Sequence, residues 1–190
     1  MNRAPGSGIE SSDWVIDVLQ FWFSELDEAQ WFAKDSGLDA RIRQRFLALH
    51  EVLVGDDWQG PSGVRPLLAA VVVLDQFSRN LFRDSARAFA ADPLARELAR
   101  QVIAGGNDSQ LRKEERYFLY LPFEHSEDGD DQALAVELIS RLGNEPWTRS
   151  ALAHKAIIDR FGRFPHRNAA LGRTSTADEI AALQERIAAV

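Results

Sequence analysis

The sequence predicts an all-α protein of about eight helices, and three observations support this fold class. Apolar residues recur at helical spacing, as in the first segment, where the residues on one face are Trp14, Val15, Val18, Leu19 and Trp22. Glycine, proline and capping residues mark where segments begin and end. The only strand-like run, AAVVVL at 69–74, stands alone, and one strand cannot make a sheet. We expect a single domain over 13–190 after a flexible tail at 1–12.

The bounds of each expected helix come from residues that typically begin or end helices. The segments run from Ser12 onward, Leu38–Val54, Pro66–Arg83, Asp92–Gly105, Asp108–Tyr120, Asp131–Leu142, Ser150–Phe161 and from Thr176 onward. Asp92 is interpreted as a helix cap because Pro93 follows in the first turn. Thr176 and Glu179 form a capping box. Pro122 is expected to stop the fifth segment, and the third is expected to be central because most of its sides are apolar.

Composition limits the class of function. The chain of 190 residues has a net charge of -7 and a pI near 5.1, which argues against a general nucleic-acid binder. It has no cysteine, and its longest apolar run, Leu67–Leu74, is too short to span a membrane. The start lacks the pattern of a secretory signal, so a cytoplasmic location is expected. Only three of the 22 basic residues are lysines, and arginine makes forked contacts with carboxylates and phosphates that lysine cannot.

The first of three polar clusters follows the apolar run, in the segment VVVLDQFSRNLFR. Asp75 and Arg79 are four residues apart, and Arg83 continues the same helical face. Gln76 and Asn80 form the adjacent row. A carboxylate at the end of a buried helix must be paired. The cluster is therefore either an internal ion pair that fixes neighbouring helices or one wall of a polar pocket.

The second cluster is acidic and lies in LPFEHSEDGDDQ. His125 stands among the acids Glu124, Glu127, Asp128, Asp130 and Asp131. Asp128 and Asp130 can cap the next helix, but His125 and Glu127 are not needed for that role. No metal is expected, because no defined metal-motif spacing is present; the side chains that would ligate one are His125, Glu127 and Asp128. A solvated acidic loop, or an acidic partner for the arginines, is the preferred interpretation.

The third cluster is the basic stretch RFGRFPHRNAALGR at 160–173, which contains four arginines, one histidine and no acid. Its polar residues before the final arginine are Arg160, Arg163, His166, Arg167 and Asn168, and His154 points partly inward from the helix before it. Gly162 ends that helix, and the phenylalanines need burial, so the arginines must lie at the rim of a site. The acidic loop and the basic stretch could neutralise each other, or they could face each other across a cleft. Both interpretations bring the acidic loop and the basic stretch close together. A shared site further requires Asp75 or Arg79 to lie near residues 163–168, and His125 to lie near one of them.

These motifs resemble one protein family. LDQFSRNLFR, AFAADPLA, FLYLPFEHSED, the histidine at 154 and RFGRFPHRNAALGR are similar to the DUF924 family of bacterial and some eukaryotic proteins, whose function is not established. The resemblance covers roughly Val15 to Leu183. It implies an all-α fold similar to tetratricopeptide-repeat superhelices, with helices in antiparallel pairs in a right-handed superhelix; a compact bundle is the alternative. It implies no catalytic residues.

Three functions fit the clusters. The first is binding of a small anionic molecule or an acidic peptide by forked contacts, with ligand residues drawn from all three clusters. The second is a carboxylate–histidine or metal-assisted hydrolase or transferase that acts on an anionic substrate; its candidate catalytic residues are Asp75, His125, Glu127 and His166. The third is a charged network with no ligand. No cofactor, nucleic acid or membrane partner is expected, and the sequence leaves the oligomeric state open.

Overall fold

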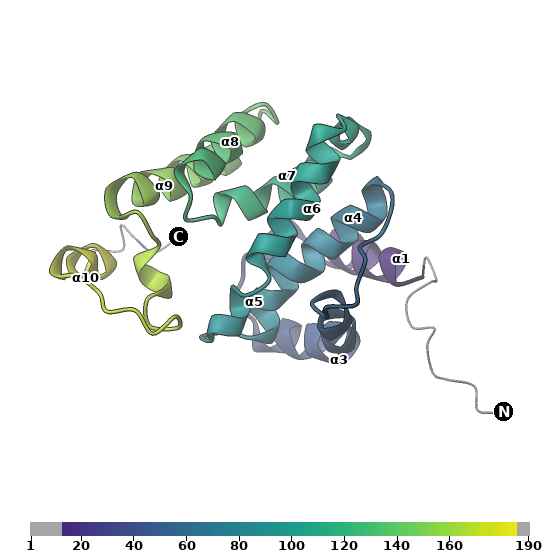
Figure 1. The fold of residues 1–190 in the computed structure, drawn as a ribbon, viewed down its shortest axis with the longest axis horizontal. Helices are drawn as coiled ribbons and strands as arrows, with labels where there is room; N and C mark the ends of the chain where they lie inside the picture. The colour runs from purple at the N-terminus through teal and green to yellow at the C-terminus, as the bar shows by residue number, and fades with distance from the viewer. Residues whose placement is uncertain (1–12, 186–190) are drawn as a thin grey trace.

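The computed structural model describes residues 13–185, and within this range the fold is all-α with no strand, as predicted (Figure 1). The longer helices are α1 (Asp13–Gln20), α3 (Ser36–Leu53), α4 (Val64–Val71), α6 (Asp92–Ala104), α7 (Lys113–Glu124), α8 (Gly129–Ser140), α9 (Glu145–Phe161) and α10 (Ala177–Gln184). Each expected segment has a counterpart here. The proposed Ser12 cap and the tail at 1–12 lie outside the described residues. None of the described helices is long and apolar enough to cross a membrane.

One long helix forms the centre of the molecule, and we call it the central helix (64–81). It consists of α4, a π-helical segment η2 (Val72–Phe77) and α5 (Ser78–Leu81), which follow one another without a break. The run AAVVVL at 69–74 is fully buried within it, so it is helix rather than strand. Helices α1, α3, α6 and α7 pack around it. The π segment carries Asp75 and Gln76, and such segments often occur at functional sites.

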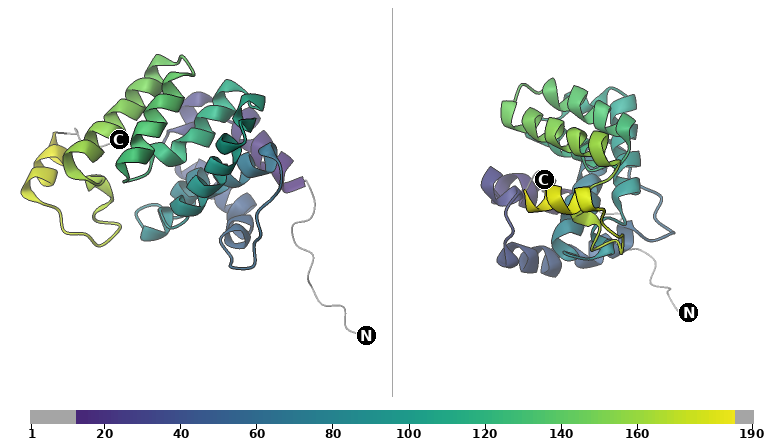
Figure 2. Two further views of the ribbon diagram at one scale, coloured as in Figure 1. Left: turned by 45° about the horizontal axis from the view of Figure 1, so that its top comes forward. Right: turned by 90° about the vertical axis from the view of Figure 1, so that its left-hand side faces the viewer.

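The C-terminal helices form a second group beside the first. Helix α8 packs against both α7 and α9; α8 and α9 lie at the upper left of Figure 1, and α7 lies beside α8 toward the centre. Helix α10 lies at the far end of this group, beyond the segment η5 (Pro165–Arg167). Figure 2 shows α10 and the turns before it close to the end of α9 in two further orientations. The chain thus folds back so that residues 162–176 approach the central helix. The right-handed superhelix stays a prediction.

The predicted end of the fifth helix is wrong. Residues Asn107–Gln110 form a short 3₁₀ turn, α7 begins only at Lys113, and Pro122 lies inside the helix. Proline removes only its own N–H, and the His125 N–H still donates to the Leu121 carbonyl at 2.9 Å. The helix therefore continues to Glu124. This places Glu124 on the last turn and His125 directly after it.

Two other expectations at helix starts are also wrong. Helix α9 begins at Glu145 rather than Ser150, because the Asn144 side chain accepts a hydrogen bond from the Trp147 N–H at 3.2 Å. Asp92 is the first residue of α6 rather than its cap, and its carboxylate binds elsewhere. The short helix α2 (Glu28–Trp31) was not predicted, although Asp27 and Gln30 form its capping box.

The punctuation at the other end of the chain is confirmed. Thr176 and Glu179 make the predicted capping box, and Gly162 ends α9 with a φ of 66°. That left-handed conformation favours glycine, since a Cβ would clash with the backbone. It turns the chain out of α9 and into the segment that returns toward the central helix.

Candidate functional site

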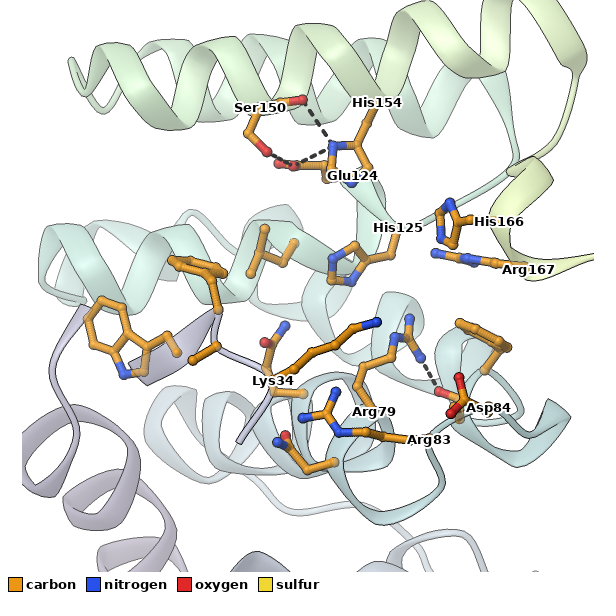
Figure 3. Close-up of a pocket in the computed structure, with 18 of the residues that line it drawn as sticks. Lys34, Arg79, Arg83, Asp84, Glu124, His125, Ser150, His154, His166 and Arg167 are labelled. Carbon is orange, nitrogen blue, oxygen red and sulfur yellow. Dashed lines mark hydrogen bonds and ion pairs between the residues drawn. The ribbon is translucent and has the colours of Figure 1, made fainter. Parts of the chain in front are cut away.

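A cavity of about 590 Å³ lies between the two groups of helices (Figure 3). Its walls come from the loop after α2, the central helix and the turn after it, the end of α7, the middle of α9 and η5. The charged and polar lining residues are Lys34, Gln76, Arg79, Asn80, Arg83, Asp84, Glu124, His125, Ser150, His154, His166 and Arg167. Eight of these belong to the predicted site, and segments far apart in sequence bring them together.

Asp92 joins the first and third clusters. Arg79 donates to both of its oxygens, from Nη1 to Oδ1 at 2.8 Å and from Nη2 to Oδ2 at 2.9 Å. Arg167 reaches the same carboxylate less closely, with Nη1 3.6 Å from Oδ2. One carboxylate therefore lies beside two buried guanidinium groups. The forked contact belongs to Arg79, and Arg167 has only the longer one.

Arg167 is the least satisfied of the cavity's arginines. The residue is 7% exposed, and its buried Nε has no hydrogen-bond partner among the described residues. The rings of Phe89 and Phe164 lie 4.7 and 4.5 Å from its guanidinium carbon, so the cation is sandwiched between aromatic faces. Burial, then repulsion from Arg79, lowers the pKa of Arg167 to about 10. Figure 3 shows this guanidinium pointing into the cavity beside His166.

A buried carboxylate also positions His125. Asp75 is fully buried, and its Oδ1 accepts a hydrogen bond from His125 Nδ1 at 2.8 Å. The Gln76 amide donates to Oδ2 at 2.5 Å, and Arg79 Nη2 lies 3.7 Å from Oδ1. Burial opposes the charge on Asp75, but His125, then Arg79 and Gln76, hold its pKa below the ordinary value. Because Nδ1–H faces Asp75, the lone pair of a neutral His125 lies on Nε2.

A second carboxylate–histidine pair lies next to the first. The Ser150 hydroxyl donates to Glu124 Oε1 at 2.8 Å, and Glu124 is only 1% exposed. His154 Nδ1 donates to the Ser150 carbonyl at 3.0 Å and also lies 3.0 Å from Glu124 Oε1. The two histidine rings are 6.2 Å apart. Both imidazoles are thus held through Nδ1, which leaves Nε2 as the basic nitrogen of each neutral ring.

The remaining lining residues are two polar groups bound to Asp39, an exposed lysine and a set of apolar side chains. Arg83 binds Asp39 through Nε and Nη2 at 2.5 and 2.8 Å, and the Asn80 amide donates to Asp39 at 2.8 Å. Lys34 is exposed, lines the cavity and has no ion pair among the described residues. The apolar lining comes from aromatic and aliphatic side chains: Trp31, Phe32, Ala33, Ala88, Phe89, Tyr117 and Leu121.

Several predicted site residues lie outside the cavity, in what we call the loop network (Glu127, Arg163, Asn168, Arg173 and Glu179). Arg173 donates to both oxygens of Glu127 at 2.7 and 2.9 Å, and Glu127 also accepts the Phe164 N–H at 2.7 Å. Arg163 binds Glu179 at 2.6 and 2.9 Å. Asn168 donates to Glu179 at 3.3 Å and accepts from Arg173 at 2.9 Å. The guanidinium groups of Arg163 and Arg173 are therefore paired with carboxylates of the protein.

The last two predicted residues serve other roles. Arg160 is half-exposed and lies 3.8 Å from Asp178, outside the cavity. Asp128 caps α8 by accepting from the Asp130 and Asp131 N–H groups. The three possible metal ligands therefore have different partners: Asp75 for His125, Arg173 for Glu127 and backbone N–H groups for Asp128. Within residues 13–185, no group of three or more His, Cys, Asp or Glu side chains could hold a metal ion.

Sequence reasoning missed Asp92, Lys34 and Phe32 as site residues. Asp92 carries a capping signature with Pro93, which masked its role as the carboxylate between two arginines. Lys34 and Phe32 stand in a short loop with no motif. One signal was available in the sequence. Trp31 and Phe32 are adjacent aromatic residues in a polar segment, and adjacent positions do not both face the core of a single helix. Glu124 belongs to the acidic cluster and to the acids that could serve general acid–base chemistry, but the sequence does not predict its contact with His154.

Comparison with known proteins identifies the family. The model of the family described as "Bacterial protein of unknown function (DUF924)" matches residues 18–186. This chain belongs to the DUF924 family. It is also similar to a solved structure described as a protein of unknown function, ATU0120 from Agrobacterium tumefaciens, with 38% identity and a TM-score of 0.81. The likeness covers 91% of this chain and 98% of that one. The comparison with curated proteins gave no match.

Proposed function

We propose that this DUF924 protein binds a small anion in the cavity, with Arg167 as the principal contact. The carrying observation is the state of Arg167, a buried cation whose nearest carboxylate is 3.6 Å away and already holds Arg79 in a forked contact. A buried charge without a close partner costs free energy, which an anionic ligand would recover. The lowered pKa of Arg167 reflects that cost.

Other cavity groups support the same ligand chemistry. Lys34 adds an exposed cation, and His125 and His154 can each donate from Nε2 when protonated. A planar guanidinium and an ammonium together suit a phosphate or carboxylate group. The volume of about 590 Å³ is within the range of small-molecule sites, which favours a small anion over an acidic peptide.

Isothermal titration calorimetry with inorganic phosphate tests this proposal. Wild type should bind one phosphate per chain, and Arg167→Met should lose at least tenfold in affinity, because the methionine stem keeps the packing against the phenylalanines without the charge. Arg160→Met is the matched control from the same basic stretch, and its affinity should equal that of wild type. Equal binding by wild type and Arg167→Met, or no binding by wild type, would reject the proposal in favour of a network with no ligand.

A second candidate function is hydrolysis of an anionic ester, favoured by the two carboxylate–histidine pairs. Asp75 holds Nδ1 of His125, and the Ser150 carbonyl, with Glu124 beside it, holds Nδ1 of His154. Nε2 is therefore the basic nitrogen of two histidines that line one cavity. One histidine could remove a proton from water as its oxygen attacks the ester, while the other, protonated, gives a proton to the leaving oxygen. With 4-nitrophenyl phosphate as substrate, His125→Asn should lower turnover by about 100-fold or more, and Arg160→Met should not. No turnover by wild type would reject hydrolysis of this ester class.

A further inference from the structure

We infer that the ligand of this cavity is an organic anion with a flat apolar group, so that the cavity binds an amphipathic molecule. This inference rests on the proposed anion site at Arg167 and adds the class of molecule to it. An inorganic phosphate would fill only a small part of about 590 Å³, so the ligand must extend beyond its charged group. The lining shows what the rest of the ligand would contact.

The apolar end of the cavity is built on a rigid aromatic cluster. Trp31 packs edge-on against the fully buried Phe118, with centroids 4.9 Å apart, and its indole N–H donates to the Trp22 carbonyl at 2.8 Å. Tyr117 stacks on Trp147 at 4.2 Å with nearly parallel rings. These rings are therefore held in place from behind, and their remaining faces and edges line the cavity. A preorganised aromatic wall of this kind suits a flat apolar group.

Phe32 is the residue that points most clearly to such a ligand. It lines the cavity and is 55% exposed, although its neighbours Tyr117 and Phe118 are nearly or fully buried. Its ring lies parallel to that of Phe118, with an interplanar angle of 9°, which leaves the opposite face uncovered by that ring. An apolar group that covered this face would gain the burial that Phe32 lacks.

Charged and apolar side chains line the same cavity. Lys34 follows Phe32 by two residues, and both line the same space, so one short loop supplies an apolar ring and a cation. Arg167 closes the other side from η5. A ligand whose anionic group meets Arg167 and whose aromatic part meets Phe32 and Trp31 satisfies both ends at once. Neither a bare anion nor a neutral aromatic molecule does so.

Calorimetry with three probes tests this inference: inorganic phosphate, 1-naphthyl phosphate and 1-naphthol. We expect 1-naphthyl phosphate to bind wild type on the order of tenfold more tightly than phosphate, and 1-naphthol to bind more weakly than 1-naphthyl phosphate. Phe32→Ala should remove most of the affinity that the naphthyl group adds over inorganic phosphate. Leu152→Ala is the control, because Leu152 is 49% exposed on α9 and does not line the cavity. Arg167→Met should weaken both phosphates.

The outcomes separate the inference from the proposed function. If phosphate binds through Arg167 but 1-naphthyl phosphate binds no more tightly, or if Phe32→Ala keeps the full gain, the amphipathic class is wrong and the anion site stands. If inorganic phosphate does not bind wild type, the proposed function fails and this inference fails with it. If 1-naphthol binds as tightly as 1-naphthyl phosphate, the site recognises the apolar group alone, which also overturns the inference.

Discussion

The basic stretch at 160–173 divides into two regions that use arginine in opposite ways. In the loop network, Arg163 and Arg173 each meet a carboxylate of their own in a forked contact at 2.6 to 2.9 Å. In the cavity, Arg167 shares Asp92 with Arg79 and has an unpartnered Nε within the described structure. The same residue type thus closes the fold in one region and leaves a positive charge under-compensated in the other.

The pKa shifts follow this difference. The contacts with Asp92 and Asp75 outweigh the burial of Arg79 and raise its pKa, and the Glu179 hydrogen bond raises that of Arg163. Arg167 alone of the three has a lowered pKa, because burial and the neighbouring Arg79 outweigh Asp92. The number of arginines therefore does not distinguish the two regions. The number of carboxylates close to each guanidinium group does.

The largest expected effect is at Asp92. Asp92→Asn removes the one carboxylate between two buried guanidinium groups and should lower the free energy of unfolding by about 3 kcal/mol or more. Urea denaturation measures this loss. Adding Arg167→Met to Asp92→Asn should restore part of it, because Arg167 then has no carboxylate of the described residues within 4 Å, whereas Arg79 keeps Asp75. A double variant no more stable than Asp92→Asn would show that Arg167 carries no electrostatic cost.

A smaller effect is expected in the loop network. Glu127→Ala removes the acceptor of two Arg173 hydrogen bonds and one Phe164 N–H, and should lower the free energy of unfolding by about 2 kcal/mol. Phosphate affinity should fall much less than in Arg167→Met, because Glu127 does not line the cavity. Denaturation and calorimetry on one preparation measure both quantities. A loss of phosphate binding as great as in Arg167→Met would show that the two regions act as one.

The smallest expected change is the part of the pH dependence of stability that Glu179, in the loop network, contributes. The Arg163 hydrogen bond, then the Thr176 N–H, lowers the pKa of Glu179 to about 2 from 4.5. A carboxylate with a lowered folded pKa stabilises the protein fully above its unfolded pKa, and this contribution is lost as pH falls from about 4.5 toward 2. The free energy of unfolding of wild type should therefore fall more between pH 4.5 and 3 than that of Glu179→Gln. Equal pH slopes for the two proteins would show that the Glu179 carboxylate does not stabilise the fold.

Local sequence patterns predicted most of the helices but only part of the candidate site. Helical spacing and the Thr176–Glu179 box predicted elements that the structure confirms, because both depend on neighbours in sequence. Asp92 lies 13 residues from Arg79 and 75 from Arg167, so its shared contacts depend on how α6, α5 and η5 pack. No local pattern distinguishes it from a cap. Likewise, Arg163 and Arg167 look alike in the sequence, and only tertiary packing gives one a carboxylate of its own.

The central claim is that Arg167, and not the arginines of the loop network, meets the anion. Nitrogen-15 NMR of the arginine Nε–H groups tests it directly, with signals assigned through Arg167→Lys and Arg163→Lys. On titration with phosphate, the Arg167 signal should shift in a saturable way with the calorimetric affinity, while the Arg163 signal stays in place. A stationary Arg167 signal at saturating phosphate, or an equal shift of Arg163, would contradict the account.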